Sequence, residues 1–349
     1  MKLVTKPDTL AERLALSLNL APAPLMETQV ALLSARAIMA ATELGVFSAL
    51  LHGPLGSAKI AAKCGLHPRA TEPLLGALVS LDYLRFHRER FALTPKSRQW
   101  LAQRECWSLF DYMPHLRDVW EFATHLEEFL RDGAALDIHN GQSEGAWSRY
   151  QKAMRSLAAL SAAEVAGRLS LPSAAGRMLD IGGAHGFYSV ALCRKYPQMT
   201  ATILDLPEAI AQAASILASE GMGDRVKHLA GDALTYDLGE NAYHLILLSN
   251  LVHHFTEAQN RDLAGRAARA LVPGGLLVIQ DLIRPASPNS GDQAGQVLNL
   301  FFALTSTSGT WSIAEIQDWL RSAGLAVRRT LYLRSVPGAA QVVGVKRED

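Results

Sequence analysis

A chain of 349 residues that is 49% hydrophobic can bury a large core and exceeds the usual size of one domain, so we expect two domains. Its 34 Lys and Arg nearly balance 33 acids, and a net charge of +1 gives no overall field for nucleic acid or anionic lipid. Cys64, Cys106 and Cys193 are widely spaced, which argues against a disulfide framework or zinc cage and favours a cytoplasmic protein. Glu12 and Arg13 interrupt the N-terminal apolar run that a secretory signal needs, and no segment reaches the ~20 apolar residues of a membrane span.

The first predicted element is a long helix. Residues 26–52 carry apolar residues at mixed spacings of three and four and are rich in alanine and leucine, which predicts a largely buried helix. Helical stretches at 58–66 and 67–84 follow, and the basic sequence RFHRERFALTP then predicts a pair of strands. Two short helices followed by a strand pair are typical of a winged helix.

A winged helix can bind DNA, but the residues of its second short helix argue against that role. This helix shows Arg69 together with Glu72 and Asp82, and most of its other residues are Leu, Ala and Val. Contacts to phosphates need several Lys or Arg on an exposed face. We therefore expect no nucleic-acid partner, and we predict that residues 1–106 form a helical winged-helix dimerisation domain whose long apolar helix fits a subunit interface.

Residues 107–172 are helical in pattern and rich in large side chains, including Trp147, Tyr150 and Met154. Such side chains on amphipathic helices can form a core. A segment that joins two domains can also line the cleft between them, where substrates bind. Both interpretations stay open, and we describe 107–172 as a helical connector lining the substrate cleft.

From residue 173 to 349, strands and helices alternate. The apolar stretches are RMLDIGG, ATILDLP, RVKHLAGDAL, YHLILLSN and GLLVIQDLI. Short apolar strands separated by helical stretches predict parallel βαβ units, so the expected fold class here is α/β with a doubly wound, Rossmann-like sheet. Ligands of such sheets bind at the carboxyl ends of the strands. A Pro-Gly-Gly turn at 273–275 is expected to lead into the fifth strand.

The stretch LDIGGAHG at 179–186 is a strand end, a glycine turn and a helix start. Gly182 and Gly183 let the backbone bend sharply and approach a ligand closely. With Gly186 they do not match the GxGxxG spacing of an NAD site. Asp180 would repel a pyrophosphate at the helix N-terminus, but it favours a cofactor with an ammonium and a sulfonium, such as S-adenosylmethionine (SAM).

Two further acids follow the next two strands. Asp205 ends the second strand, where an acid can accept hydrogen bonds from both ribose hydroxyls of a nucleoside. Asp232 follows the third strand and can accept a hydrogen bond from the adenine amine. Each aspartate alone could also be a helix cap or a turn residue. Acids at three successive strand ends favour an adenosine-containing cofactor.

Two adjacent histidines follow the fourth strand. If the fourth and fifth strands are neighbours, His253 reaches Asp281, which would orient the imidazole and stabilise its protonated form, as in a general base. Such a base would deprotonate an acceptor hydroxyl, because a phenol has a pKa of about 10. The histidine pair could also cap the following helix or bind metal, but no other histidines form an evident second half of a zinc site. Asn250 and His254 are candidate polar contacts to a substrate.

Taken together, LDIGGAHG, ILDLPEAI, AGDAL, LSNLVHHFTE, LVPGGLLVIQD and LNLFFALTSTSGTWSIAEIQDWLRSAGL resemble the SAM-dependent O-methyltransferases of the caffeate and acetylserotonin type, especially their bacterial natural-product branch. The resemblance covers nearly the whole chain and implies a homodimer through the N-terminal domain. It implies that His253 is the catalytic base, that Asp281 supports it, and that Ser249 contacts the methionine portion of SAM or the ring edge. The predicted cofactor contacts are Asp180, Gly182, Gly183, Asp205, Leu206, Asp232, Ala233 and Ser249.

Four positions depart from the pattern of that family. Asp281 is shorter than the usual glutamate, Thr310 stands where a second glutamate is common in plant members, and His254 replaces an aspartate. Ala184 replaces a frequent glycine. Relatives on this scaffold also catalyse hydroxylation, decarboxylation or ring closure, so these reactions are the alternative to methyl transfer.

The predicted function is methyl transfer from SAM to a hydroxyl of a small aromatic or polyketide-like molecule, without a metal ion and without a membrane partner. A winged-helix regulator with a ligand-sensing domain is a second alternative. The weakly supported candidates for the pocket wall are Trp147, Tyr150, Met154, Phe301, Phe302 and Trp311.

Overall fold

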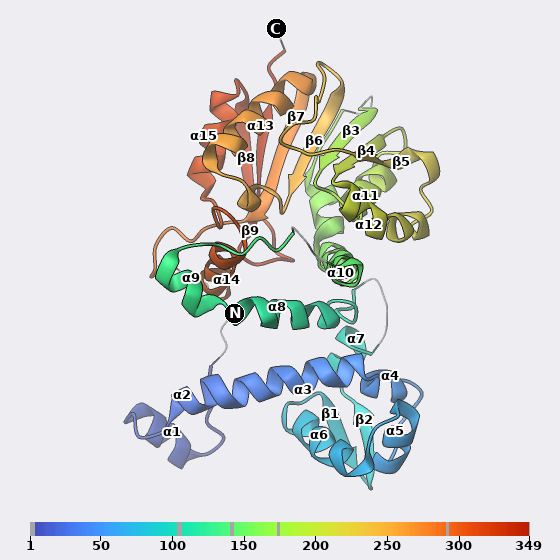
Figure 1. The fold of residues 1–349 in the computed structure, drawn as a ribbon, viewed down its shortest axis with the longest axis vertical. Helices are drawn as coiled ribbons and strands as arrows, with labels where there is room; N and C mark the ends of the chain where they lie inside the picture. The colour runs from blue at the N-terminus through green and yellow to red at the C-terminus, as the bar shows by residue number, and fades with distance from the viewer. Residues whose placement is uncertain (1–3, 103–106, 140–142, 173–174, 291–292, 349) are drawn as a thin grey trace. The chain divides into compact units, whose positions relative to one another are not determined.

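The computed structural model describes residues 4–102, 107–139, 143–172, 175–290 and 293–348. The chain divides into two compact units, residues 2–117 and 118–349 (Figure 1). No helix of the described residues is both long and apolar enough to cross a membrane.

The unit of residues 2–117 is mostly helical and holds one antiparallel hairpin, in which Leu84 pairs with Leu93. Its elements are α1 (Leu10–Ser17), α2 (Ala23–Leu25), η1 (Met26–Val30), α3 (Ala31–Glu43), α4 (Val46–Ala49), α5 (Ser57–Cys64), α6 (Pro68–Ser80), β1 (Leu84–His87), β2 (Arg90–Leu93), α7 (Pro95–Trp100) and η2 (Met113–His115). Helices α5 and α6 with the β1–β2 hairpin confirm the winged-helix pattern.

The long helix predicted at 26–52 is shorter than expected and less buried. It begins with α2, continues through the π-helical η1 and ends with α3, because the chain turns at Gly45, which has a φ of +79° that favours glycine. Only Met39, Ala41 and Thr42 of α3 are buried. The large apolar side chains exposed in this region include Leu25, Met26, Val30, Leu32 and Leu33.

The unit of residues 118–349 contains one seven-stranded sheet in the order β5-β4-β3-β6-β7-β9-β8. Its elements are α8 (Leu116–Ala123), α9 (Leu126–Asp132), α10 (Glu144–Arg168), β3 (Arg177–Ile181), α11 (Phe187–Lys195), β4 (Thr200–Asp205), α12 (Pro207–Ser219), η3 (Gly223–Arg225), β5 (Val226–Ala230), β6 (Tyr243–Ser249), η4 (Val252–His254), α13 (Glu257–Ala270), β7 (Leu271–Leu282), α14 (Gln293–Thr305), α15 (Ile313–Ser322), β8 (Ala326–Tyr332) and β9 (Ala339–Val345).

Strands β3 to β7 are mutually parallel, and β9 runs antiparallel between β7 and β8. The chain order moves outward from β3 to β5, and then returns to β6 on the other side of β3. Ligands of open α/β sheets bind at such a switch point, outside the carboxyl ends of the strands. The predicted glycine turn follows β3 and therefore lies at this place.

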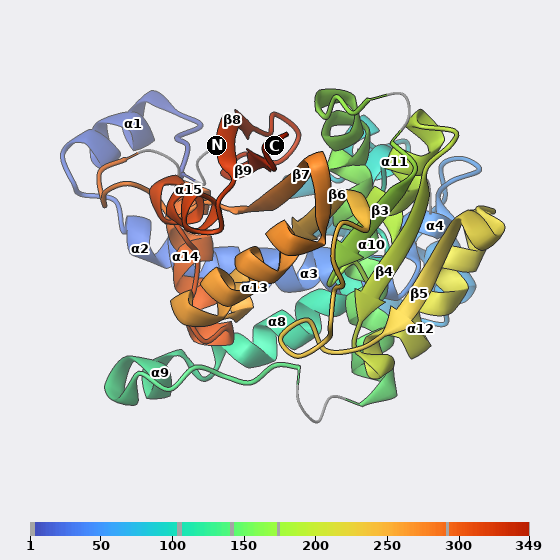
Figure 2. The ribbon, with the colours of Figure 1, turned by 90° about the horizontal axis from the view of Figure 1, so that it is seen from above.

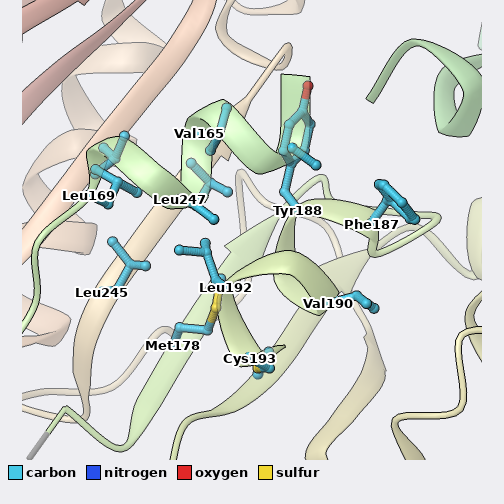
Figure 3. Close-up of a cluster of buried hydrophobic side chains, with 14 of the residues drawn as sticks. Val165, Leu169, Met178, Phe187, Tyr188, Val190, Leu192, Cys193, Leu245 and Leu247 are labelled. Carbon is cyan, nitrogen blue, oxygen red and sulfur yellow. The ribbon is translucent and has the colours of Figure 1, made fainter. Parts of the chain in front are cut away.

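Helices cover both faces of the sheet, as Figure 2 shows. One face packs against α10 and α11 through a cluster that includes Val165, Met178, Leu192, Leu245 and Leu247 (Figure 3). The other face packs against α13 and α15 through a second cluster of buried side chains. Because both faces are covered, the central strands are apolar on both sides, which explains their continuous apolar sequences.

The fifth strand of the sequence begins earlier than predicted. β7 starts at Leu271 and contains the Pro-Gly-Gly sequence, so 273–275 is not a turn that precedes the strand. Gly274 has a φ of +74° and donates its N–H to the carbonyl of Lys346 at 2.9 Å, which keeps this irregular part of the strand paired. The pairing of β6 with β7 shifts register nearby, between Tyr243 and Leu245.

Candidate active site

The carboxyl ends of β6 and β7 bring the predicted base to its predicted acid. His253 lies in η4, directly after β6, and Asp281 lies near the end of β7. Nδ1 of His253 is 2.9 Å from both carboxylate oxygens of Asp281, and both side chains are buried. An ionised carboxylate only accepts hydrogen bonds, so Nδ1 carries the proton and Nε2 of His253 is left to accept one.

The turn that carries His253 is held by buried hydrogen bonds to its backbone. The carbonyl of Val252 accepts hydrogen bonds from the Trp311 indole and from the Asn260 amide, both at 2.9 Å. Helix α13 is capped by Thr256 with Gln259, so the idea that the histidine pair caps this helix is wrong. Trp311, a candidate for the pocket wall, therefore stabilises the turn that carries His253 through its hydrogen bond to Val252.

His253 belongs to a cluster of three histidines, His139, His253 and His254. The rings of His253 and His254 have centroids 4.1 Å apart, and Nε2 of His254 lies 3.4 Å from Nε2 of His139. Burial lowers the pKa of His139 to about 4 and holds the pKa of His254 well below its ordinary value, and nearby His253 lowers both further. At neutral pH both are uncharged, and the ring of His253 lies 2.9 Å from the Asp281 carboxylate.

Aromatic side chains surround this histidine cluster. Trp147 stacks on His139 with centroids 5.5 Å apart, and Tyr150 meets His139 edge-on at 5.4 Å. Phe302 lies 4.4 Å from the ring of His253. These contacts join α10, α14 and η4, three elements far apart in the sequence. Burial raises the pKa of Tyr150, and its proximity to Asp205 and Asp281 adds to the shift.

The predicted glycine loop has the close contacts that require small residues. Gly182 has a φ of +72°, and a Cβ at this position would lie 2.8 Å from Leu251. A Cβ on Gly183 would overlap the carboxyl group of Asp180. Both glycines are therefore needed for the backbone to turn over the end of β3.

Asp180 is fully enclosed beneath the glycine loop. Its Oδ2 accepts a hydrogen bond from Ser189 at 2.7 Å, and its buried Oδ1 has no hydrogen-bond partner in the described part of the chain. Burial raises the pKa of Asp180 to about 7, the Ser189 hydrogen bond opposes this shift, and nearby Asp205 adds to it. A cationic ligand would favour the ionised form of Asp180 and so reverse this shift.

The raised pKa of Asp180 predicts a pH-dependent stability in the absence of ligand. The folded state binds this proton more tightly than the unfolded chain, whose aspartate has a pKa of about 3.9. Stability from this group is present below about pH 4 and is lost as the pH rises to about 7. We expect Asp180→Asn, which stays neutral, to gain in melting temperature over the wild type between pH 5 and pH 8. A difference that stays constant over this range, measured by calorimetry, would contradict this account.

Asp205 ends β4 and fixes two backbone groups beside the glycine loop. Its Oδ2 accepts the N–H of Ala184 and its Oδ1 accepts the N–H of Leu206, each at 2.8 Å. Burial raises the pKa of Asp205, while these two hydrogen bonds oppose the shift. Each carboxylate oxygen has a second lone pair, so Asp205 can still accept hydrogen bonds from the hydroxyls of a ligand.

The other predicted cofactor residues are less enclosed. Asp232 is exposed, and its Oδ1 accepts the N–H of Leu234 at 2.8 Å. This local bond is that of a turn residue, which was the alternative to a role in adenine binding. Leu206 is exposed at the start of α12, and Ala233 packs against the core beneath α13. Ser249 is buried and accepts a hydrogen bond from Gln280 at 2.9 Å.

The predicted residues fall into three groups. His253, Asp281, His254, Phe302, Trp147 and Tyr150 share one set of contacts, and Asp180, Gly182, Gly183 and Asp205 share another around the glycine loop. Asn250 is exposed and Met154 is half-buried, and the contacts described above include neither. Thr310 is buried and donates a hydrogen bond to Asn299.

Two residues of the site were missed by the sequence analysis. His139 lies in the irregular segment between α9 and α10, where no periodic pattern indicates its partners. His228 lies inside β5, and its Nε2 is 2.7 Å from the carbonyl oxygen of Ala184 in the glycine loop. Among the described residues, no group of three ligand-type side chains is placed to hold a metal ion.

The residues at the glycine loop fit a cationic nucleoside cofactor. Burial raises the pKa of both Asp180 and Asp205, so each carboxylate would gain from a cation nearby that compensates its charge. A ligand with a sulfonium and an ammonium would supply that compensation, whereas the pyrophosphate of NAD would not. Asp180, Gly182, Gly183 and Asp205 would hold such a cofactor.

The comparisons with known proteins place the chain in one family and agree with the observed fold. Residues 131–326 match the O-methyltransferase domain, and residues 26–103 match the O-methyltransferase dimerisation domain. The 3-hydroxy-5-methyl-1-naphthoate 3-O-methyltransferase of Streptomyces sahachiroi is 29% identical over 93% of this chain and 95% of its own length. The tetracenomycin polyketide synthesis 8-O-methyl transferase of Streptomyces glaucescens is 28% identical, over 88% and 93%. The crystal structure of human N-acetylserotonin methyltransferase with SAM has a TM-score of 0.83 at 21% identity, over 99% and 100%.

The O-methyltransferase model alone covers more than half of the chain, so the chain belongs to the O-methyltransferase family. It is a SAM-dependent enzyme, and it carries the dimerisation domain of that family. The predicted family, fold class and cofactor are therefore confirmed.

Proposed function

We propose that this enzyme transfers the methyl group of SAM to a hydroxyl of a small aromatic or polyketide-like molecule, with His253 as general base and Asp281 as its supporting acid. The observation that carries the proposal is the buried 2.9 Å contact between His253 Nδ1 and Asp281, on the edge of the sheet that also bears the glycine loop. The acceptor class is supported by the naphthoate and tetracenomycin enzymes, which match over most of their lengths.

The chain's own residues act on the acceptor rather than on the methyl group. Bound SAM supplies a methyl group activated by a sulfonium. A phenol with a pKa of about 10 is almost fully protonated at neutral pH, so it needs a base to become nucleophilic. Nε2 of His253 accepts the hydroxyl proton, and the Asp281 carboxylate stabilises the imidazolium that forms. His139 and His254 stay neutral, so they do not compete for this proton.

The wall of the acceptor pocket is proposed from the ring contacts around the base. Trp147, Tyr150 and Phe302 present apolar faces next to the histidine cluster, which suits a flat aromatic acceptor. His254 offers a neutral polar contact beside the base. Met154 and Asn250 are proposed from their positions in the sequence alone.

The remaining roles are assigned by residue range. We infer that residues 1–106 form a homodimer through the exposed apolar side chains of α1 to α3, that 107–172 connect the domains and line the substrate cleft, and that 173–349 bind SAM. The matched dimerisation domain supports the first assignment. Free thiols at Cys64 and Cys193 support a cytoplasmic location, and Cys106 lies outside the described residues.

The alternatives are less well supported by the residues. Hydroxylation, decarboxylation or ring closure on the same scaffold would not need the His253–Asp281 pair, which this chain retains. A nucleic-acid-binding regulator would need a basic recognition helix, whereas α6 exposes Arg69 together with Glu72. We therefore propose a small-molecule acceptor as substrate and no nucleic-acid partner.

A calorimetric titration with SAM and S-adenosylhomocysteine tests the cofactor site directly. We expect Asp205→Ala to weaken binding of both compounds about tenfold, because it removes the acceptor of ribose hydrogen bonds and releases the Ala184 and Leu206 amides. Asp237→Ala is the matched control, because the Asp237 carboxylate accepts the N–H of nearby Gly239, a local turn bond away from the glycine loop. Equal affinities for wild type and Asp205→Ala would place the adenosine elsewhere.

A further inference from the structure

Ala184 is the one residue of the glycine loop that combines a side chain with a left-handed backbone. Its φ is +28°, a region that residues other than glycine adopt only with backbone strain. Such a conformation persists only where its surroundings fix it. The backbone of Ala184 is in fact held at both polar groups, and its methyl group packs with Trp147, Ala209 and Ala213.

The two hydrogen bonds to Ala184 come from neighbouring strands. Its N–H is donated to Asp205 at the end of β4, at 2.8 Å. Its carbonyl lies 2.7 Å from Nε2 of His228, which projects from the middle of β5, where it pairs in register with Ile203 of β4. A carbonyl oxygen only accepts, so His228 donates from Nε2 and its tautomer is fixed.

We propose that His228 is a positioning residue for the cofactor, whose hydrogen bond to the Ala184 carbonyl holds the glycine loop in the conformation that binds SAM. The inference rests on the proposed role of residues 182–186 in binding SAM. Without His228, the backbone of Ala184 can relax to negative φ, and the glycine loop then leaves the conformation that binds SAM.

The first test removes and then restores the donor. We expect His228→Ala to weaken S-adenosylhomocysteine binding about tenfold by calorimetry, because it removes one short hydrogen bond to a strained backbone carbonyl. His228→Gln, whose side-chain Nε2 can also donate, is expected to recover binding to within about threefold of wild type. With a suitable acceptor, the KM for SAM rises in His228→Ala while kcat at saturating SAM is unchanged.

The second test asks whether His228 acts through Ala184. Glycine adopts positive φ without strain, so in Ala184→Gly the loop depends less on the hydrogen bond from His228 to keep its conformation. In this background, we expect His228→Ala to weaken binding only about threefold instead of about tenfold, and the two substitutions are therefore non-additive. The control is His244→Ala, which removes a histidine at the amino end of β6, where Nδ1 accepts the N–H of Arg177.

The outcomes separate this inference from the proposed function. The positioning role alone is overturned if the wild type binds S-adenosylhomocysteine and any one of three results is found. These results are unchanged binding in His228→Ala, no recovery in His228→Gln, and equal losses of affinity in the wild-type and Ala184→Gly backgrounds. A wild type that binds neither SAM nor its product overturns the cofactor site and the inference with it. Thermal unfolding of each variant shows whether the fold is kept, and the His228→Gln comparison stays informative if His228→Ala is unstable.

Discussion

His253→Ala is expected to lower kcat for methyl transfer to a phenolic acceptor by about 10²- to 10⁴-fold, with unchanged affinity for S-adenosylhomocysteine. The substitution removes the group that accepts the hydroxyl proton, and it leaves the glycine loop and Asp205 intact. Steady-state rates with saturating SAM, together with calorimetry, measure the two quantities separately.

A series of acceptors makes the His253→Ala result specific for proton removal. An acceptor whose hydroxyl has a pKa below 7 is already ionised at neutral pH, so it should lose much less rate than a phenol with a pKa of about 10. If both acceptors lose rate equally, the imidazole contributes alignment rather than base catalysis. If neither loses rate, His253 is not the base.

Asp281→Asn is expected to lower kcat about 100-fold, again without a change in cofactor affinity. Asparagine matches the shape of aspartate but lacks the charge that stabilises the protonated imidazole of His253. Its amide can also donate to Nδ1, which would leave the proton on Nε2 and remove the acceptor site. The measurement is kcat at saturating SAM and acceptor.

The control for Asp281→Asn is Asp281→Glu, which restores the carboxylate with a longer side chain. We expect its kcat to lie within about tenfold of the wild-type value, because the charge beside Nδ1 is regained. An Asp281→Asn enzyme as fast as wild type would show that the buried 2.9 Å contact is structural only.

The sequence predicted the parallel sheet and the positions of several candidate residues at its strand ends, because the chain order determines this geometry. In parallel sheets all carboxyl ends lie on one edge, so placing Asp180, Asp205, His253 and Asp281 at strand ends implied that all four lie along that edge. The pairing of His253 with Asp281 followed from β6 and β7 being neighbours. The glycines were predictable because only they fit close turns.

The contacts that the sequence did not reveal are set by tertiary packing. His139 lies between helices in a segment without periodicity, and its contact partner His254 is 115 residues away in the chain. His228 looks like an ordinary strand residue in the sequence, because a strand pattern does not indicate which loop its side chain contacts. β9 inserts antiparallel between β7 and β8, which no local pattern indicated.

The early end of the long helix has a physical explanation as well. Apolar periodicity continues through 26–52, but Gly45 is able to take positive φ and ends the helix at Glu43. The exposure of Leu32 and Leu33 could not be predicted from the apolar periodicity either. An apolar stripe on a helix has the same sequence pattern whether it packs on its own core or on a second subunit.

The most direct test of the central claim is to follow a labelled methyl group. Purified enzyme is incubated with SAM carrying a deuterated methyl group and a panel of hydroxylated naphthoates and polyketide-like phenols, and products are identified by mass spectrometry. The account predicts a methyl ether that carries the label with the wild type and little or none with His253→Ala. An unlabelled product that is hydroxylated or decarboxylated, or a labelled methyl group on carbon or nitrogen, would contradict it.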